Sequence, residues 1–162
     1  AVLNDGRYGH SVQDGGVRVS LLRAAKYPDP TQDHGKHRVT ISVMPHGPGL
    51  HDVMRAAEAL NMPLRAVAPG NAQQFPEPLV QLDGEGVEVS AVKAADDGSG
   101  DLVVRLYEGC GNRAPITVRT PFRVTRAERC NLLEEPQDAL ETSDGIVSLM
   151  LRPFELVTLR LR

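Results

Sequence analysis

The chain has 162 residues, a formal net charge of −3, no Trp and only 4% aromatic residues. This charge gives no electrostatic basis for binding nucleic acid, which needs clustered Lys and Arg. The longest apolar runs are far shorter than the ~20 residues that cross a bilayer. We therefore expect no nucleic acid and no membrane as a partner. Fifteen Gly and 12 Pro favour short strands joined by turns over long helices.

The first segment, residues 1–68, combines strand patterns with one helix pattern. Apolar and polar residues alternate over 17–21 and 39–43, as in half-buried strands. The polar loop between them, 24–36, is too long for a tight hairpin. Residues 50–60 place their apolar side chains on one face, which predicts a helix.

The rest of the chain predicts a different architecture. Residues 69–78 contain three Pro and predict a linker or crossover. Beyond it, short alternating runs are separated by turn signals. We expect strands near 79–82, 86–94, 101–108, 115–119, 122–129, 145–151 and 154–162. This spacing predicts an all-β unit over 79–162, a small seven-strand immunoglobulin-like β-sandwich.

Alternation within these strands also predicts which side chains face the core. The expected inward set is Leu102, Val104, Leu106, Val157, Leu159 and Leu161. Arg105 and Tyr107 should face the opposite way, and Thr158, Arg160 and Arg162 should lie in water.

Two cysteines, Cys110 and Cys130, are too few for a disulfide framework. We interpret them as unpaired thiols in a reducing cytoplasm, and the alternative is one disulfide that spans a hairpin. The chain starts with Ala1-Val2-Leu3, a pattern typical of the middle of a strand. We therefore expect a fragment of a longer protein, with the cytoplasm as its location.

Asp29, Asp33, His34 and His37 lie close together in and beside the 24–36 loop. This pattern could hold a metal ion or supply an acid–base pair. Asx turns explain the same two aspartates, since Asp next to Pro or before His-Gly is common turn chemistry. We favour the turn interpretation.

The order and spacing of residues 4–46 carry a family resemblance. They run Asn-Asp-Gly-Arg-Tyr-Gly over 4–9, Val-Arg-Val-Ser-Leu-Leu-Arg over 17–23 and Tyr-Pro-Asp-Pro over 27–30, and end at Pro45-His46. This region closely resembles the start of the C-terminal β region of glycoside hydrolase family 38, the α-mannosidases. Residues 151–161 resemble the closing strand of the same family.

The resemblance implies a domain plan and a function. Residues 1–68 would be the last part of the family's large β-sandwich domain, with one short helix, and 79–162 its terminal small β-sandwich. The parent enzyme would hydrolyse terminal α-linked mannose with retention of configuration, using one divalent metal that we expect to be zinc. Its partners would be the mannoside substrate and its own N-terminal catalytic domain, with a homo-oligomer also considered.

The resemblance assigns no catalytic and no metal-binding residue to this chain. In the family, the Asp nucleophile and the zinc ligands come from the N-terminal α/β domain, and no stretch here matches those motifs. The resemblance implies instead that the loop after Leu22 leans over the mannose pocket, where the residue matching Arg23 can contact the sugar through its backbone. We therefore expect Arg23, Tyr27 and Asp29 to line the substrate, and the chain by itself to be inactive.

A free-standing carbohydrate-binding or structural β-sandwich module is the competing interpretation. Carbohydrate-binding modules usually present two or three exposed Trp or Tyr rings to the sugar faces. This chain has no Trp and three Tyr, at positions 8, 27 and 107. The composition therefore favours the enzyme portion over the binding module.

Overall fold

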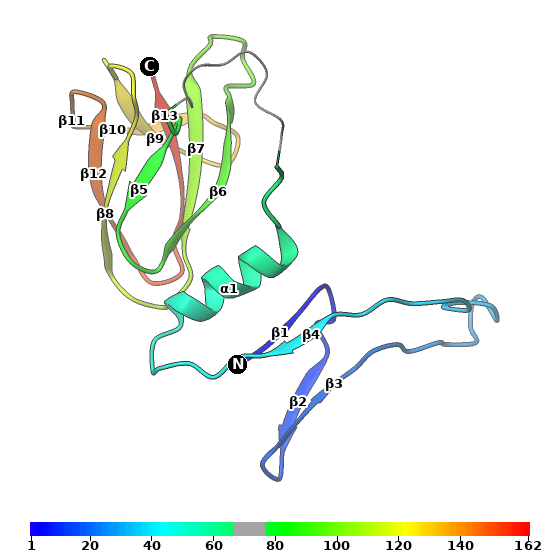
Figure 1. The fold of residues 1–162 in the computed structure, drawn as a ribbon. Helices are drawn as coiled ribbons and strands as arrows, with labels where there is room; N and C mark the ends of the chain where they lie inside the picture. Colours follow the sequence, from blue (N-terminus) through cyan, green and yellow to red (C-terminus); the bar gives the residue numbers. More distant parts are fainter. Residues whose placement is uncertain (67–76) are drawn as a thin grey trace. The chain divides into compact units, whose positions relative to one another are not determined.

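The computed structural model of the chain describes residues 1–66 and 77–162. It divides into two compact units, Ala1–Ala66 and Val67–Arg162 (Figure 1). The expected linker, 69–78, lies outside the described residues except for its last two positions.

The first unit contains four short strands and one helix. They are β1 (Val2–Asn4), β2 (His10–Gln13), β3 (Gly16–Val19), β4 (Ile41–Val43) and α1 (His51–Asn61). Strand β1 pairs with β4 and strand β2 pairs with β3, both antiparallel. The structure thus contains strands within 17–21 and 39–43 and a helix over 50–60, as predicted, although both strands are shorter than the alternating runs.

Helix α1 ends where its sequence stops it. The N–H of Met62 donates to Glu58 O at 2.7 Å, and Pro63 cannot continue the hydrogen-bond pattern. Among the described residues, no helix is both long enough and apolar enough to span a membrane.

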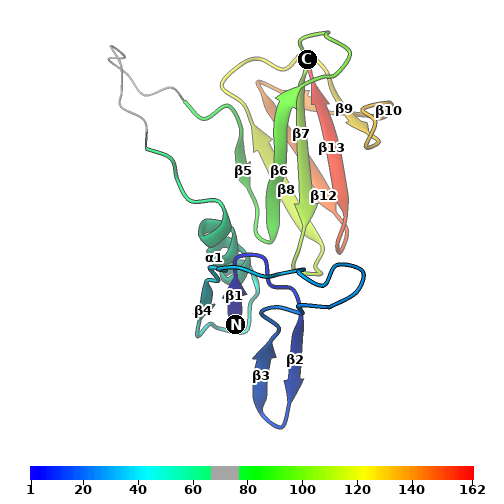
Figure 2. The same cartoon turned by 90° about the vertical axis from the view of Figure 1, so that its right-hand side faces the viewer.

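The first unit has almost no apolar core. Among its described residues, Leu3 is the one buried hydrophobic side chain, and every residue of β2 is exposed. Its exposed large apolar side chains are Tyr8, Val12, Val17, Leu21, Leu22, Tyr27, Ile41, Val43, Leu50, Met62 and Leu64. Figure 2 shows the β2–β3 hairpin as an isolated pair of strands within this unit.

The second unit is a two-sheet antiparallel sandwich, which confirms the all-β architecture. Its strands are β5 (Gln81–Asp83), β6 (Val87–Ala94), β7 (Leu102–Glu108), β8 (Ala114–Arg119), β9 (Ala127–Cys130), β10 (Pro136–Leu140), β11 (Thr142–Ser143), β12 (Ile146–Leu151) and β13 (Leu156–Leu161). One sheet has the order β10-β9-β13-β7-β6 and the other β11-β12-β8-β5. Six of the seven expected strands correspond to β5, β6, β7, β8, β12 and β13.

The strand predicted over 122–129 is wrong for most of its length. Residues 120–126 connect one sheet to the other, and only β9 is a strand. Val124 produces the strand-like alternation because it is buried in the core. Strands β10 and β11 escape prediction because their residues are largely exposed and polar, so no alternation marks them.

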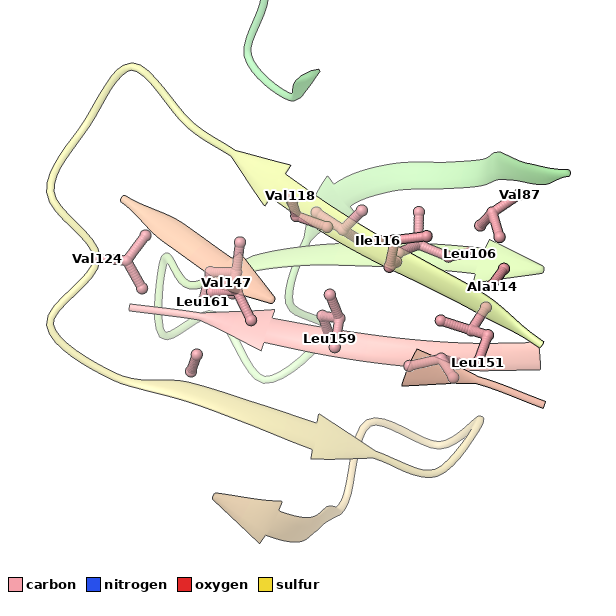
Figure 3. Packing of buried hydrophobic residues seen from close by; sticks show 13 residues of the cluster. Val87, Leu106, Ala114, Ile116, Val118, Val124, Val147, Leu151, Leu159 and Leu161 are labelled. Carbon is pink, nitrogen blue, oxygen red and sulfur yellow. The ribbon is translucent and has the colours of Figure 1, made fainter. Parts of the chain in front are cut away.

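Buried aliphatic side chains from both sheets fill the space between them (Figure 3). Leu106 of β7 lies beside Ile116 and Val118 of β8 in this layer, and Val104 of β7 belongs to the same buried cluster. The expected inward residues of β13, namely Val157, Leu159 and Leu161, are all buried in the same cluster. Alternation therefore assigned the inner face of both strands correctly.

The outer face of the five-stranded sheet is less exposed than its alternation predicts. Thr158 is 2% exposed and the Arg160 side chain 11%, so the prediction that both lie in water is wrong. The loops 95–101 and 131–135 both contribute polar contacts to this face. The Arg162 side chain, in contrast, is 54% exposed.

Ion pairs and hydrogen bonds hold these loops in place. Arg160 donates from Nε to Asp101 Oδ2 at 2.6 Å, and Arg162 donates to both carboxylate oxygens of Asp101. The hydrogen bonds from Arg162, together with Arg160, lower the pKa of Asp101 to about 2. Arg105 bonds Thr158 Oγ1 and also Leu132 O, which ties the second loop to the sheet.

A buried carboxylate, Glu108, organises one end of the sandwich. Its Oε1 accepts the N–H groups of Cys110 and Asn112, and its Oε2 accepts those of Gly111 and Phe154, all at 2.8 to 3.1 Å. Burial by itself would raise the pKa of Glu108, but these donors, Phe154 first, hold it below its usual value. Glu108 therefore joins the β7–β8 turn to the β12–β13 turn.

Cys110 and Cys130 are not joined by the alternative hairpin-spanning disulfide. Burial raises the pKa of both thiols. Neither thiol is therefore activated as a nucleophile.

Candidate functional site

The 20–40 loop, which connects β3 to β4, is fixed at both ends. Ser20 N donates to Gly9 O at 2.8 Å at one end, and Thr40 N donates to Asp5 Oδ2 at 2.9 Å at the other. The Thr40 N–H lowers the pKa of Asp5 and keeps the carboxylate ionised. The segment 4–9 thus forms the base on which the loop stands.

The Asn-Asp-Gly sequence of that base forms a turn, as its residue types predict. Asn4 Oδ1 accepts the N–H groups of Gly6 and Arg7, at 3.0 and 2.6 Å. Asn61, the last residue of α1, donates from Nδ2 to Asn4 O at 3.0 Å. These residues have a structural role, because their polar atoms are used to hold the base.

Hydrogen bonds also define the shape of the loop. Ala24 N donates to Asp33 Oδ2 at 3.1 Å, which closes the loop internally, and a ring nitrogen of His37 lies 2.9 Å from Asp33 O. Ala24 and Asp33 both have positive φ, 48° and 60°, a conformation that residues other than Gly adopt rarely. The loop therefore has a defined conformation, with backbone strain where Ala24 and Asp33 meet.

Asp29 forms the Asx turn that its position between two prolines predicts. Its Oδ1 accepts from both the N–H and the Oγ1 of Thr31, at 2.8 and 2.7 Å. The Thr31 N–H lowers the pKa of Asp29, which is consequently an anion at neutral pH. Within residues 1–66 and 77–162, no group of three or more His, Cys, Asp or Glu is arranged to hold a metal ion.

Arg23, Tyr27 and Asp29 lie on this loop, but they do not share one pocket. Arg23 is exposed and lines an open hollow with Gly9, Ser20, Leu21 and Leu22. Tyr27 is 88% exposed, and neither Tyr27 nor Asp29 lines the hollow. Contact of the three residues with a sugar stays a prediction.

The loop can position a ligand but shows no geometry for bond cleavage. Both of its aspartates, Asp29 and Asp33, accept hydrogen bonds from the loop's own backbone. A retaining glycosidase needs two carboxyl groups about 5–5.5 Å apart that face the sugar. Aspartates that hold a turn in this way do not form an acid–nucleophile pair.

Sequence reasoning missed the residues that hold the loop. Thr40 and Asp5 are 35 positions apart and Asn61 and Asn4 are 57 apart, so no local pattern connects them. The one available signal was the polar character of the 4–9 turn, which predicts a turn and not its long-range partners.

Comparison with known proteins matches both units to one family. The model described as "Glycosyl hydrolases family 38 C-terminal domain" matches residues 1–31, and the family's "C-terminal beta sandwich domain" matches residues 86–159. The chain belongs to the C-terminal β region of glycosyl hydrolase family 38. The first match includes Arg23, Tyr27 and Asp29, and the second runs from the turn before β6 into β13.

Curated relatives of this family 38 chain carry α-mannosidase names. It is 37% identical to Alpha-mannosidase 2C1 of Homo sapiens, 30% to Alpha-mannosidase G of Dictyostelium discoideum and 27% to an Alpha-mannosidase of Saccharomyces cerevisiae. Each alignment covers 99% of this chain. The chain spans only 16% to 17% of the length of these relatives.

Proposed function

We propose that this chain is the C-terminal, non-catalytic β portion of an α-mannosidase that removes terminal α-linked mannose with retention of configuration. The observation that carries the proposal is the alignment of nearly the whole chain with four proteins named as α-mannosidases. The family match over residues 1–31 includes the whole 4–9 base and the first part of the 20–40 loop.

In this proposal the 20–40 loop forms one wall of the mannose pocket. Its ends are fixed to the 4–9 turn, and its exposed part carries Arg23, Tyr27 and Asp29. Loops fixed on a rigid base commonly carry binding groups. The exposed Tyr27 ring and the Asp29 carboxylate supply an apolar face and a hydrogen-bond acceptor, both suited to a sugar.

The catalytic domain, its nucleophile and one divalent metal, proposed to be zinc, belong to the part of the polypeptide outside this sequence. Such a metal would polarise or orient the substrate there. We also propose a cytoplasmic location, which the small number of cysteines, two in 162 residues, supports.

The first test compares the chain with the complete polypeptide. The 162-residue chain, supplied with zinc or cobalt, should hydrolyse an aryl α-mannoside no faster than buffer, while the complete polypeptide should turn it over. Turnover by the repurified chain alone would contradict the placement of the active centre. A complete polypeptide without activity would contradict the function itself.

The second test concerns the loop. Arg23→Gly in the complete enzyme frees the backbone that is proposed to contact the sugar, and misplaced positioning groups cost on the order of 10²-fold in rate. Stability should change by no more than about 0.5 kcal/mol, because the side chain is exposed. Arg38→Gly, also exposed and near the other end of the loop, is the matched control and should leave kinetics unchanged. If Arg23→Gly, like Arg38→Gly, keeps the kinetics of the wild-type enzyme, the loop is not part of the site.

A further inference from the structure

The carboxylate of Asp33 reaches across the 20–40 loop to the peptide bond that follows Arg23. Asp33 Oδ2 accepts the N–H of Ala24 at 3.1 Å, and the two residues are nine positions apart in the sequence. Local bonds from an aspartate to the backbone join residues about two to four positions apart, so this bond is not part of an ordinary turn. It connects the two sides of the loop at the position of Arg23.

This bond fixes the direction of the Arg23 carbonyl. The peptide bond between Arg23 and Ala24 is trans, so its C=O and N–H groups point in opposite directions. Because the N–H is directed at Asp33, Arg23 O is directed away from the Asp33 carboxylate. Within the described part of the chain, no group donates a hydrogen bond to Arg23 O. Arg23 also lines the open hollow, so an oriented backbone acceptor lies beside it.

The backbone at both ends of the bond has an unfavourable conformation. The φ angles of Ala24 and Asp33 are 48° and 60°, in the left-handed region. Alanine rarely adopts this region, so its conformation at position 24 needs support from the surrounding structure. The bond to Asp33 provides such support. Residues held in this way are concentrated at sites that contact ligands.

The backbone that carries the Asp33 carboxylate is itself ordered. The neighbours of Asp33 in the chain, Gln32 and His34, both donate their N–H groups to carbonyls earlier in the same turn, at 3.3 and 3.0 Å. A ring nitrogen of His37 lies 2.9 Å from Asp33 O. These contacts lower the conformational entropy that is lost when the carboxylate binds Ala24.

We propose that Asp33 is a positioning residue of the mannose pocket: its carboxylate orients the Arg23–Ala24 peptide so that Arg23 O accepts a hydrogen bond from a sugar hydroxyl. This inference rests on the proposed function, in which the sugar contacts the backbone at Arg23. Asp33 acts through the Ala24 N–H and exchanges no proton with the substrate. Its importance therefore comes from its acceptor oxygen and not from its charge.

The test compares variants of the complete enzyme on an aryl α-mannoside. Asp33→Ala removes the acceptor of the Ala24 N–H, whereas Asp33→Asn keeps an acceptor oxygen without the charge. Asp14→Ala is the matched control, because Asp14 is also exposed and has a φ of 53°, but lies in the turn between β2 and β3. The same substitution is thus made in a similar backbone conformation outside the loop. The kcat, KM and melting temperature are measured for each variant.

Asp33→Ala should lower kcat/KM at least about tenfold, because a displaced carbonyl no longer meets the sugar hydroxyl. Asp33→Asn should stay within roughly threefold of the wild type, since a neutral acceptor binds the N–H somewhat more weakly than a carboxylate does. Asp14→Ala should keep wild-type kinetics, and the two alanine variants should melt at the same temperature. If Asp33→Ala has the kinetics of Asp14→Ala, or if Asp33→Asn is as slow as Asp33→Ala, the inference is wrong.

A double variant distinguishes positioning through the Arg23–Ala24 peptide from a general effect on the fold. Arg23→Gly frees the same peptide, so adding Asp33→Ala to it should lower kcat/KM little further. A decrease equal to the product of the two single effects would overturn the inference, because Asp33 would then act independently of Arg23. A wild-type complete polypeptide without mannoside hydrolysis would contradict the proposed function, and this inference with it. An active wild-type enzyme that tolerates Asp33→Ala would contradict the inference alone.

Discussion

The two units of this chain are stabilised in different ways. Of the seventeen buried hydrophobic residues among those described, sixteen belong to Val67–Arg162 and one, Leu3, to Ala1–Ala66. The sandwich has a closed core between two sheets, whereas the first unit is held by side-chain-to-backbone hydrogen bonds such as Asp5 to Thr40. A unit held mainly by exposed polar contacts gains little free energy from folding alone.

The small apolar core of the first unit predicts low stability for this unit in isolation. A two-stranded hairpin such as β2–β3 is only marginally stable in water by itself. Its paired Val12 and Val17 are both exposed, so the hairpin buries little apolar surface within this unit. We propose that Ala1–Ala66 is the portion of a larger β domain that other strands cover.

The largest expected effect comes from expressing the two units separately. Residues 77–162 alone should melt in one cooperative transition, because the core strands all lie within them. Residues 1–66 alone should show no cooperative transition by circular dichroism, because one buried apolar side chain cannot offset the conformational entropy of folding. A cooperative transition in 1–66 would contradict the comparison.

A substitution in the core of the sandwich should destabilise the protein much more than one in the first unit. Leu106 is fully buried between the sheets, so Leu106→Ala should lower the free energy of unfolding by about 2–5 kcal/mol through lost contacts and a cavity. Leu64 in the first unit is fully exposed, and Leu64→Ala should change it by less than about 0.5 kcal/mol. Chemical denaturation of both variants measures the two changes in the free energy of unfolding. Similar decreases for the two variants would indicate that Leu64 is packed more tightly than its exposure suggests.

Glu108 tests the polar part of the sandwich. Glu108→Gln keeps the side-chain shape but turns an amide NH₂ group toward two backbone N–H donors. We expect a loss of about 2–3 kcal/mol in unfolding free energy, since buried donors would lose charged acceptors. Glu85→Gln, at an exposed position nearby in sequence, is the control and should be nearly neutral. A neutral Glu108→Gln would show that the four hydrogen bonds add no net stability.

Acid should weaken the sandwich through Asp101. Its pKa is lowered to about 2 in the folded state from 3.8, so its ion pairs stabilise the fold above about pH 4 and are lost as the pH falls toward 2. The contribution is about 2 kcal/mol, measurable as melting temperature against pH. Asp101→Asn should be less stable at neutral pH and should flatten the curve between pH 4 and 2. An unchanged slope would mean that other carboxylates dominate acid unfolding.

Sequence predicted the parts of the fold that depend on neighbouring residues. The alternation of Val104 and Leu106 gave the inner face of β7, and Asp29 between prolines gave an Asx turn. Thr158 and Arg160 were placed wrongly because their covering loops are far away in the chain. Periodicity reports which face of a strand a residue occupies, and it carries no information on what later covers that face.

The candidate site was predictable in outline only. The family motif located the loop, whereas the bonds that fix it, such as Asp5 to Thr40, join residues with no local relation. Arg23 is placed at a hollow by the β2–β3 pairing, which the sequence predicted only in part.

The hydrogen bonds of Glu108 should affect the rate at which the sandwich unfolds. Its bond to Phe154 N joins positions 46 residues apart, and the two turns that it links belong to connections that need both sheets in place. We expect this contact to form after the rate-limiting step, and a contact of that kind slows unfolding without changing the refolding rate. Removing this carboxylate should then accelerate unfolding and leave the refolding rate nearly unchanged. The turn that carries Phe154 would thus determine how long the sandwich stays folded, through the unfolding rate.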